Sequence, residues 1–376
     1  MSHDLDFTGL AEELERRFAR GTEEPWPDQD FDALALSAFR IQYEAEPAFR
    51  AFCDGRGRTP ATVERWRDLP AVPARAFKHI ELAVADPEVV FETSGTARGR
   101  DVRGRHLVPR VSLYRASLLP PFRRHVMAAV DGVSEESADC MPVLSLIPSP
   151  AAMPRSSLSF MVGAAVDAFA TQTHWLVDAA GALDEARLRT CARDAAAADE
   201  PVLVLGTALA LLHAVERLER EPTAGLPAGT RVMETGGFKG LDRAIDRDEL
   251  YDRIEAVLGV PRDRIVSEYG MTELLSQLYT PVLTEGLAAA GEHVPPPWLK
   301  VRALDPASLD EVAPGEPGLL AFFDLANAGS VCHVLTEDVG VVVEGRVRLQ
   351  GRVRGAEPRG CSRAMDELMS SAGTIT

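Results

Sequence analysis

The fold class can be inferred outward from residues 202–207, whose sequence is Val202-Leu203-Val204-Leu205-Gly206-Thr207. A short apolar run that ends in a glycine and a hydroxyl predicts a buried strand, and the apolar spacing over 208–220 predicts a helix directly after it. Similar apolar runs occur at 143–147 and 231–234, again with helical patterns between them. This alternation predicts an α/β fold with a parallel sheet flanked by helices.

Several of the predicted strands end at small or hydroxyl residues. In open parallel sheets, ligands bind in the crevice outside the carboxyl ends of the strands. We therefore expect four strand ends to converge on one crevice, near Thr96, Gly206, Gly237 and Gly270.

Composition narrows the class of partner. The chain has 376 residues and a formal net charge of -17, which disfavours nucleic acid and anionic membranes as main partners. The five cysteines are scattered without a C-x-x-C pair, and the histidines form no metal-ligand spacing. No signal peptide is visible, and the most apolar run, 202–215, is too short to span a bilayer. We expect a cytoplasmic protein with reduced thiols.

Changes in local composition and in the predicted helices and strands suggest the domain organisation. Residues 1–298 are expected to form an α/β core. After Pro295-Pro296-Pro297, residues 299–350 show short strand patterns without a long helix and are expected to form a β-rich subdomain of the same unit. Residues 351–376 are expected to form a short polar C-terminal segment that carries Cys361 and frays.

Residues 79–91 are expected to form a strand, and a hydroxyl-rich loop follows it. Its sequence is Thr93-Ser94-Gly95-Thr96-Ala97-Arg98-Gly99-Arg100. Small residues leave backbone N–H groups accessible and hydroxyls add donors, which is what a loop needs to hold a phosphate. A plain surface loop is the alternative.

Three further residues are candidates for chemistry. Asp338 lies in Thr336-Glu337-Asp338-Val339-Gly340, expected to be a tight turn whose carboxylate accepts from both hydroxyls of a ribose, or an ordinary acidic turn. Arg352 follows nearby and suits phosphate or ribose contacts, unless it is simply solvated. Cys361 lies among Arg359 and Arg363, cations that would lower the pKa of a thiol in an exposed position; an incidental cysteine is the alternative.

Four motifs in order resemble those of the adenylate-forming (acyl-activating) enzyme superfamily. Thr93–Thr96 resembles its phosphate loop, and Tyr269-Gly270-Met271-Thr272-Glu273 resembles its second nucleotide motif. Thr336–Gly340 resembles its ribose motif, and Gly351-Arg352 the start of its hinge motif. The resemblance implies the fold of the large domain of these enzymes, with ATP and Mg²⁺ as cofactors. It also implies that the α/β core of residues 1–298 binds the acyl group and the nucleotide.

The resemblance also implies residue roles. The phosphates would contact Thr93, Ser94, Gly95 and Thr96. Adenine would lie by Gly236, Gly237, Tyr269 and Gly270. Thr272 would bond the α-phosphate, Glu273 would hold Mg²⁺, and Asp338 with Arg352 would bind the ribose.

Within this superfamily the chain is more similar to the acyl-protein synthetase (LuxE-type) family. The supporting segments include Leu69-Pro70-Ala71-Val72-Pro73, Gly206-Thr207-Ala208-Leu209, Glu234-Thr235-Gly236-Gly237-Phe238-Lys239-Gly240 and Arg359-Gly360-Cys361-Ser362. Members lack the C-terminal lid domain of full-length ligases, so we expect it to be absent or vestigial here. In this family a cysteine at the position of Cys361 accepts the acyl group as a thioester.

The resemblance implies an enzyme that activates a fatty or aromatic carboxylic acid with ATP and passes the acyl group through Cys361. The recipient would be a protein such as an acyl reductase or an acyl carrier protein. The phosphate loop departs from the family at Ala97-Arg98, where threonine and glycine are usual. Two alternatives therefore stay open: an acyltransferase that takes its acyl group from a CoA thioester, and a non-catalytic nucleotide-binding module.

Overall fold

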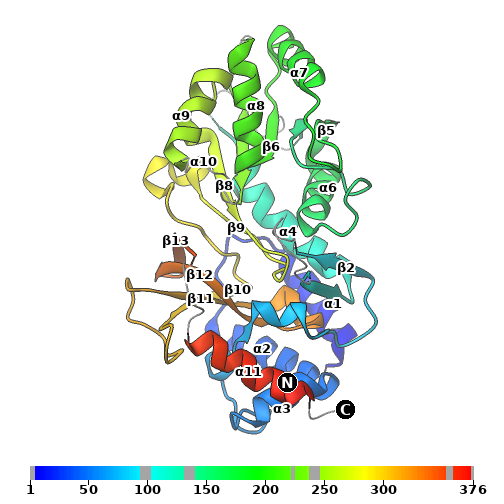
Figure 1. Cartoon of the computed structure of the whole chain (residues 1–376), viewed down its shortest axis with the longest axis vertical. Coiled ribbons are helices and arrows are strands. Elements are labelled where there is room, and N and C mark those ends of the chain that lie inside the picture. The colour runs from blue at the N-terminus through cyan, green and yellow to red at the C-terminus, as the bar shows by residue number, and fades with distance from the viewer. Residues whose placement is uncertain are drawn as a thin grey trace. The chain divides into compact units, whose positions relative to one another are not determined.

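The computed structural model describes residues 5–93, 103–130, 140–221, 225–236, 246–352 and 359–373. The chain divides into two compact units. The first contains Met1–Pro120, Met271–Gln277 and Val294–Thr376, and the second contains Pro121–Gly270 and Leu278–His293. Figure 1 labels the elements of both units.

The second unit contains the predicted parallel sheet. Its six strands run in the order β5-β4-β6-β7-β8-β9, and all neighbours are parallel except the final pair, β8 with β9. The strands are β4 (Met141–Ser145), β5 (Ala170–Trp175), β6 (Leu203–Thr207), β7 (Arg231–Thr235), β8 (Ile265–Tyr269) and β9 (Leu278–Tyr279). The expected α/β architecture is confirmed.

Helices connect these strands and bury the sheet. They are α6 (Ser157–Phe169), α7 (Glu185–Ala198), α8 (Ala208–Arg220), α9 (Arg247–Leu258) and the short α10 (Val282–Glu285), with 3-10 turns η3 (Arg262–Arg264) and η4 (Leu287–Ala289). Helix α8 begins where residues 202–207 predict it: Thr207 is its N-cap, and the Thr207 hydroxyl accepts from Ala210 N. Gly206 is required just before it, because a Cβ there would lie 2.7 Å from Leu211 Cγ.

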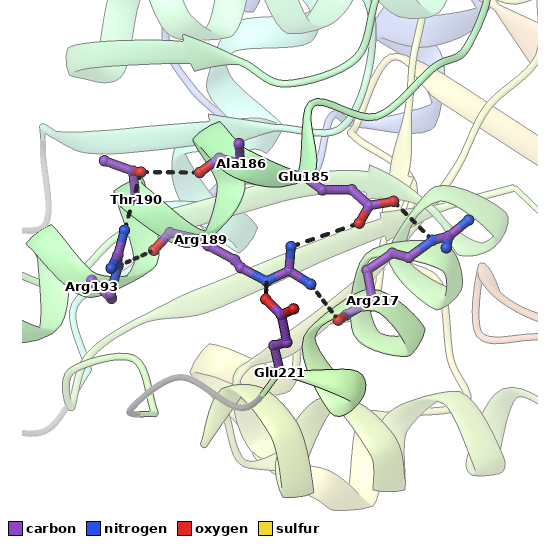
Figure 2. Close-up of polar contacts among 7 residues, drawn as sticks. All are labelled: Glu185, Ala186, Arg189, Thr190, Arg193, Arg217 and Glu221. Carbon is purple, nitrogen blue, oxygen red and sulfur yellow. Dashed lines mark hydrogen bonds and ion pairs between the residues drawn. The ribbon is translucent and has the colours of Figure 1, made fainter.

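A surface network attaches α7 to the end of α8 (Figure 2). Arg189 donates to the carbonyl of Arg217 at 2.9 Å and lies 3.3 Å from the carboxylate of Glu221. Glu185 lies 3.1 Å from Arg217 Nε. Cations near the last turn of a helix complement its dipole, and each exposed pair contributes at most about 1 kcal/mol. We interpret this network as structural.

The first unit is built on a mixed sheet. Its strands run in the order β1-β12-β11-β10, and β13 also pairs with β12. They are β1 (Val72–Pro73), β10 (Leu299–Leu304), β11 (Pro317–Asp324), β12 (His333–Val343) and β13 (Arg346–Arg352). A separate antiparallel hairpin consists of β2 (Val89–Glu92) and β3 (Arg105–Val108).

Helices from both ends of the chain pack in the first unit. They are α1 (Phe7–Phe18), α2 (Asp28–Ala45), α3 (Pro47–Asp54), α4 (Val111–Val126) and α11 (Arg359–Gly373), with 3-10 turns η1 (Trp66–Asp68), η2 (Ala74–Lys78) and η5 (Leu325–Gly329). The boundary between the units falls within α4. Figure 1 shows α11 beside α3.

This packing divides the chain differently from the expected domains. The N-terminal helices join residues 294–376 instead of the parallel sheet. Phe31 of α2 contacts Phe323 of β11 with ring centroids 5.8 Å apart, and Phe18 of α1 contacts Trp298 at 4.4 Å. Burial of aromatic rings from distant parts of the sequence stabilises this packing more than contacts between neighbouring segments of the chain do. Local composition does not reveal such long-range contacts.

Three local expectations differ from the structure. Residues 359–373 form the helix α11 instead of a fraying segment. The stretch 79–91, expected to be a strand, is extended strand only from Val89. Thr336–Gly340 lies inside the 11-residue strand β12 and is not a tight turn, because β11 and β13 pair with it on both sides.

Candidate active site

The segment Met271–Gln277 follows β8 in the chain and belongs to the first unit. It contains two predicted site residues, Thr272 and Glu273. Thr272 is half-buried and Glu273 is buried. The segment is irregular, with turns instead of a helix or strand. Its backbone groups therefore lack the partners that regular structure supplies, and side chains must supply them.

Asp324 supplies two of those partners. Its carboxylate is fully buried and accepts from Leu275 N at 3.0 Å, Ser276 N at 2.9 Å and Ser276 Oγ at 2.7 Å. It also accepts from Ala326 N at 3.0 Å. Burial raises the pKa of Asp324 to about 6, and the four donors oppose that rise. Asp324 is therefore mostly ionised at neutral pH.

The predicted ribose residues lie side by side on neighbouring strands. Asp338 of β12 is in register with Arg352 of β13, and Arg352 Nε donates to Asp338 Oδ1 at 3.0 Å. Asp338 N donates to Thr336 Oγ1, whose hydroxyl donates to the carbonyl of Leu320 at 2.8 Å. The carboxylate thus has a fixed backbone and the guanidinium of Arg352 as a partner, and it suits hydroxyl donors such as those of a ribose.

The predicted phosphate loop is described only at its start. Ser94, Gly95 and Thr96 lie outside the described residues. Thr93 N donates to the carbonyl of Gly104, and Gly104 N donates to Thr93 Oγ1, both at 2.9 Å. Thr93 therefore pairs with Gly104 at the end of the β2–β3 hairpin from which the connecting loop leaves. That hairpin is antiparallel and belongs to the first unit, so the strand before Thr96 is not part of the parallel sheet as expected.

The predicted adenine residues belong to the second unit. Gly236 follows β7 with φ of +78°, a conformation that favours glycine, while Tyr269 ends β8 and Gly270 follows it. Gly237 lies outside the described residues. Gly206 is the second-last residue of β6, so three of the four expected strand ends belong to the adjacent parallel strands β6, β7 and β8.

Two buried carboxyl groups near these strand ends were not predicted. Glu234 of β7 is fully buried, and Tyr251 donates to it at 3.3 Å. Glu268 of β8 is also buried and accepts from the hydroxyl of Thr235. Burial raises the pKa of Glu268 to about 7, with a further rise caused by Glu234. Burial also raises the pKa of Glu234, against the influence of Arg247.

Cys361 lies in a different environment from the one expected. It is only 3% exposed and packs in an apolar cluster with Ala71, Leu304, Leu319, Ala321 and Leu335. The expectation of an exposed thiol is wrong, because α11 turns the apolar side of its sequence toward the sheet of the first unit. Its role as acyl acceptor stays a prediction.

The Mg²⁺ implied by the resemblance was assigned to Glu273. In the part of the chain that the structure describes, no group of three or more His, Cys, Asp or Glu side chains could hold a metal ion. Mg²⁺ is usually held by one or two carboxylates together with substrate phosphates and waters. Glu273 fits that ion when a nucleotide supplies the remaining ligands.

A cavity of about 830 Å³ in the first unit contains none of the predicted site residues. Its lining includes Trp26 and Trp66, and several of its charges form ion pairs with one another. Arg67 lies 2.6 Å from the carboxylate of Glu311, and Lys300 lies 3.8 Å from that of Asp28. Because these cationic and anionic side chains pair with one another, they give the cavity no preference for an anionic or a cationic ligand.

Comparison with known families decides the class of protein. The family described as "Acyl-protein synthetase, LuxE" matches residues 21–370. The chain belongs to this family. Membership confirms the predicted resemblance and the prediction that the chain is an enzyme, an acyl-activating ligase.

Relatives in the acyl-protein synthetase family are distant in sequence. A long-chain-fatty-acid–luciferin-component ligase of Vibrio harveyi is 22% identical over 377 residues, covering 96% of this chain and 94% of that protein. A protein of the same name from Aliivibrio fischeri is 36% identical over 87 residues, covering 21% of this chain and 23% of that protein.

Solved structures confirm the fold. A 2-hydroxyisobutyryl-CoA ligase in an open conformation, in complex with 2-HIB-AMP and CoA, gives a TM-score of 0.61 at 15% identity, covering 93% of this chain and 82% of that chain. The same ligase in its thioesterification state gives 0.63 at 16% identity, covering 89% and 70%. The acyl-protein synthetase chain therefore has the fold of an adenylate-forming ligase. Among its described residues, no helix is long and apolar enough to cross a membrane.

Proposed function

We propose that this chain activates a carboxylic acid with ATP as an acyl-adenylate and transfers the acyl group to a protein thiol through Cys361. The observation that carries the proposal is the family match over residues 21–370, which includes Thr272, Glu273, Asp338 and Cys361. The name of the Vibrio harveyi relative refers to long-chain fatty acids. It makes fatty acids the first substrates to test, with aromatic acids second.

The first half-reaction forms the acyl-adenylate. A carboxylate oxygen of the acid attacks the α-phosphorus of ATP, the bond to the bridging oxygen breaks, and pyrophosphate leaves. The Thr272 hydroxyl donates to the α-phosphate, and Asp338 with Arg352 holds the ribose. Glu273 would hold Mg²⁺, and the bound ion would supply positive charge where the phosphates gain negative charge.

The nucleotide base is assigned to the glycine-containing segments that resemble the nucleotide motifs of the superfamily. Gly236, Gly237, Tyr269 and Gly270 are the residues that would form the adenine pocket. Tyr269 contacts His293 with ring centroids 6.4 Å apart, which supports its ring from one edge. Thr93, Ser94, Gly95 and Thr96 would hold the outgoing phosphates.

The second half-reaction uses the Cys361 thiol. The thiolate attacks the acyl carbon, the bond to the adenylate oxygen breaks, and AMP leaves with the thioester formed on sulfur. A buried thiol reaches neither an adenylate nor a partner protein, so this step requires α11 to expose Cys361. A thiol of the acceptor, an acyl reductase or an acyl carrier protein, then attacks the acyl carbon, and the Cys361 thiol leaves as the new thioester forms.

The test is acid-dependent ATP–pyrophosphate exchange with purified protein, Mg²⁺ and a panel of fatty and aromatic acids. We expect exchange with at least one acid. Absence of exchange with every acid would refute ATP-dependent activation. Charging of a carrier protein from labelled acyl-CoA without ATP would then identify the chain as an acyltransferase.

The role of Cys361 has a separate test. Cys361→Ala should abolish covalent labelling of the chain by radioactive acid and ATP, while exchange continues at the wild-type rate. Cys140→Ala is the matched control, because Cys140 is exposed and lies outside the proposed site; it should leave both activities unchanged. Undiminished labelling of the Cys361→Ala variant would remove this residue from the mechanism.

A further inference from the structure

The backbone that carries Thr272 and Glu273 is held by buried side chains from elsewhere in the first unit. Its carbonyls at Thr272 and Glu273 accept hydrogen bonds from His106 and Asn327. These two contacts involve the two residues to which the proposed function assigns the α-phosphate and the metal. They are therefore more informative than contacts to the rest of the segment.

His106 of β3 is buried, and its protonation state follows from its partners. Its Nδ1 lies 2.7 Å from the carbonyl of Thr272, which can only accept, so Nδ1 carries the proton. Burial lowers the pKa of His106 to about 4, so the ring is neutral at pH 7 and its Nε2 accepts from Ser330 Oγ at 2.8 Å. One tautomer satisfies both contacts, and the ring stands edge-on to Phe77.

Asn327 of η5 contacts the segment through both ends of its amide. Its Nδ2 donates to the carbonyl of Glu273 at 2.8 Å and to that of Val331 at 3.1 Å. Its Oδ1 accepts from Leu275 N at 3.1 Å. The amide is buried and makes three hydrogen bonds, so its orientation and that of the Glu273 peptide fix each other.

We propose that His106 and Asn327 are positioning residues for acyl activation: they hold the Thr272 and Glu273 peptides so that the two side chains meet the α-phosphate and Mg²⁺ in a reactive geometry. This proposal rests on the proposed function. Neither residue touches the substrate. Partners of this kind typically change activity or metal affinity by about 10–100-fold when removed.

His333 provides a matched control within the same unit. It is also a buried histidine whose pKa is lowered by burial, to about 3, and its Nδ1 lies 2.9 Å from the carbonyl of Leu69. It therefore makes the same kind of hydrogen bond as His106, to a backbone carbonyl outside the Met271–Gln277 segment. Substitutions at His333 report the cost of losing such a bond without moving Thr272.

The variants separate the two contacts of His106. His106→Asn keeps an N–H near the position of Nδ1 and thus the bond to Thr272, whereas His106→Gln keeps a polar atom near Nε2 and thus the contact with Ser330. We expect His106→Gln to lower the exchange kcat by about 10–100-fold and His106→Asn to retain most of it. Asn327→Asp, which cannot donate to Glu273, should be slowed like His106→Gln.

Two measurements decide the outcome. The rate of ATP–pyrophosphate exchange is measured at a temperature below the lowest Tm of all the variants. Hydrogen–deuterium exchange of residues 272–276 is measured without substrate. We expect faster deuteration of this segment in His106→Gln and Asn327→Asp alone. His333→Asn and His333→Gln should lower the Tm while leaving both measurements unchanged.

The proposal is overturned if His106→Gln catalyses ATP–pyrophosphate exchange as fast as His333→Gln. It is also overturned if His106→Asn catalyses this exchange no faster than His106→Gln. A wild-type chain that exchanges with no acid instead refutes the proposed function, and the reaction served by this positioning with it. The rate of ATP–pyrophosphate exchange by the wild-type chain distinguishes the two failures.

Discussion

Asp324 in the first unit and Glu268 in the second are both buried carboxyl groups, but they differ in the number of donors that face them. Asp324 accepts four hydrogen bonds, three of them from backbone N–H groups. Glu268 accepts from the hydroxyl of Thr235 and lies near the like charge of Glu234. Burial raises the pKa of Asp324 to about 6 and that of Glu268 to about 7.

The difference separates two uses of a buried acid. A carboxylate with a full set of backbone donors fixes the chain that supplies them, and its negative charge is compensated locally. A carboxyl group with one hydroxyl partner gains little by ionising, so it keeps its proton up to neutral pH. Both pKa values are raised by folding, so both groups make stability depend on pH: Asp324 as pH rises from 3.8 to about 6, and Glu268 as pH rises from 4.5 to about 7. Only the carboxylate of Asp324 also fixes the backbone of the donors that face it.

Removing the donor-rich carboxylate should have the largest effect. Asp324→Ala removes the acceptor of the buried N–H groups of Ser276 and Ala326, and we expect a loss of about 4 kcal/mol in the free energy of unfolding. Urea denaturation at pH 7 measures it. Asp305→Ala is the control, because exposed Asp305 also accepts from two backbone N–H groups. An equal drop in Tm for both variants would contradict the role of burial.

Replacing the donor-poor carboxyl group should change the pH profile of stability. The pKa of Glu268 is about 7 in the folded chain against 4.5 for an ordinary glutamate, so the folded state binds the proton more tightly. Stability from this group is therefore complete below pH 4.5 and is lost as pH rises through 7, by on the order of 3 kcal/mol.

Glu268→Gln carries no titrating proton, so this part of the pH dependence should vanish. The measurement is urea unfolding of wild type and variant at pH 5 and pH 8. The wild type should lose more stability than the variant between these two values. Parallel losses in the two proteins would show that Glu268 does not titrate in that window.

An exposed ion pair should give the smallest effect on stability. The Arg352 side chain is 43% exposed and bonds Asp338, so Arg352→Ala should change the free energy of unfolding by about 0.5 kcal/mol or less. If Arg352 helps to bind ribose, the KM for ATP in the exchange reaction should rise several-fold. Arg67→Ala breaks a similarly exposed pair with Glu311 and should leave that KM unchanged. The same KM for both variants would exclude Arg352 from the nucleotide site.

The buried side chains that hold the Met271–Gln277 segment had a sequence signal that motif reasoning passed over. Asp324 and Asn327 interrupt the apolar run from Leu319 to Ala328. A polar residue within such a run is buried and must be hydrogen-bonded, which marks it as a structural centre. His106 had no comparable signal, because its partners Thr272 and Ser330 are far away in sequence.

The sequence by itself determined the alternation of strands and helices, the parallel sheet and the family. Those properties depend on local periodicity and on short motifs, which a chain carries in its order of residues. The tertiary structure alone decided that the N-terminal helices pack with residues 294–376, that Asp338 lies within a strand, and that Cys361 is buried. Each of these depends on contacts between residues far apart in the chain, where burial and hydrogen bonding outweigh local preference.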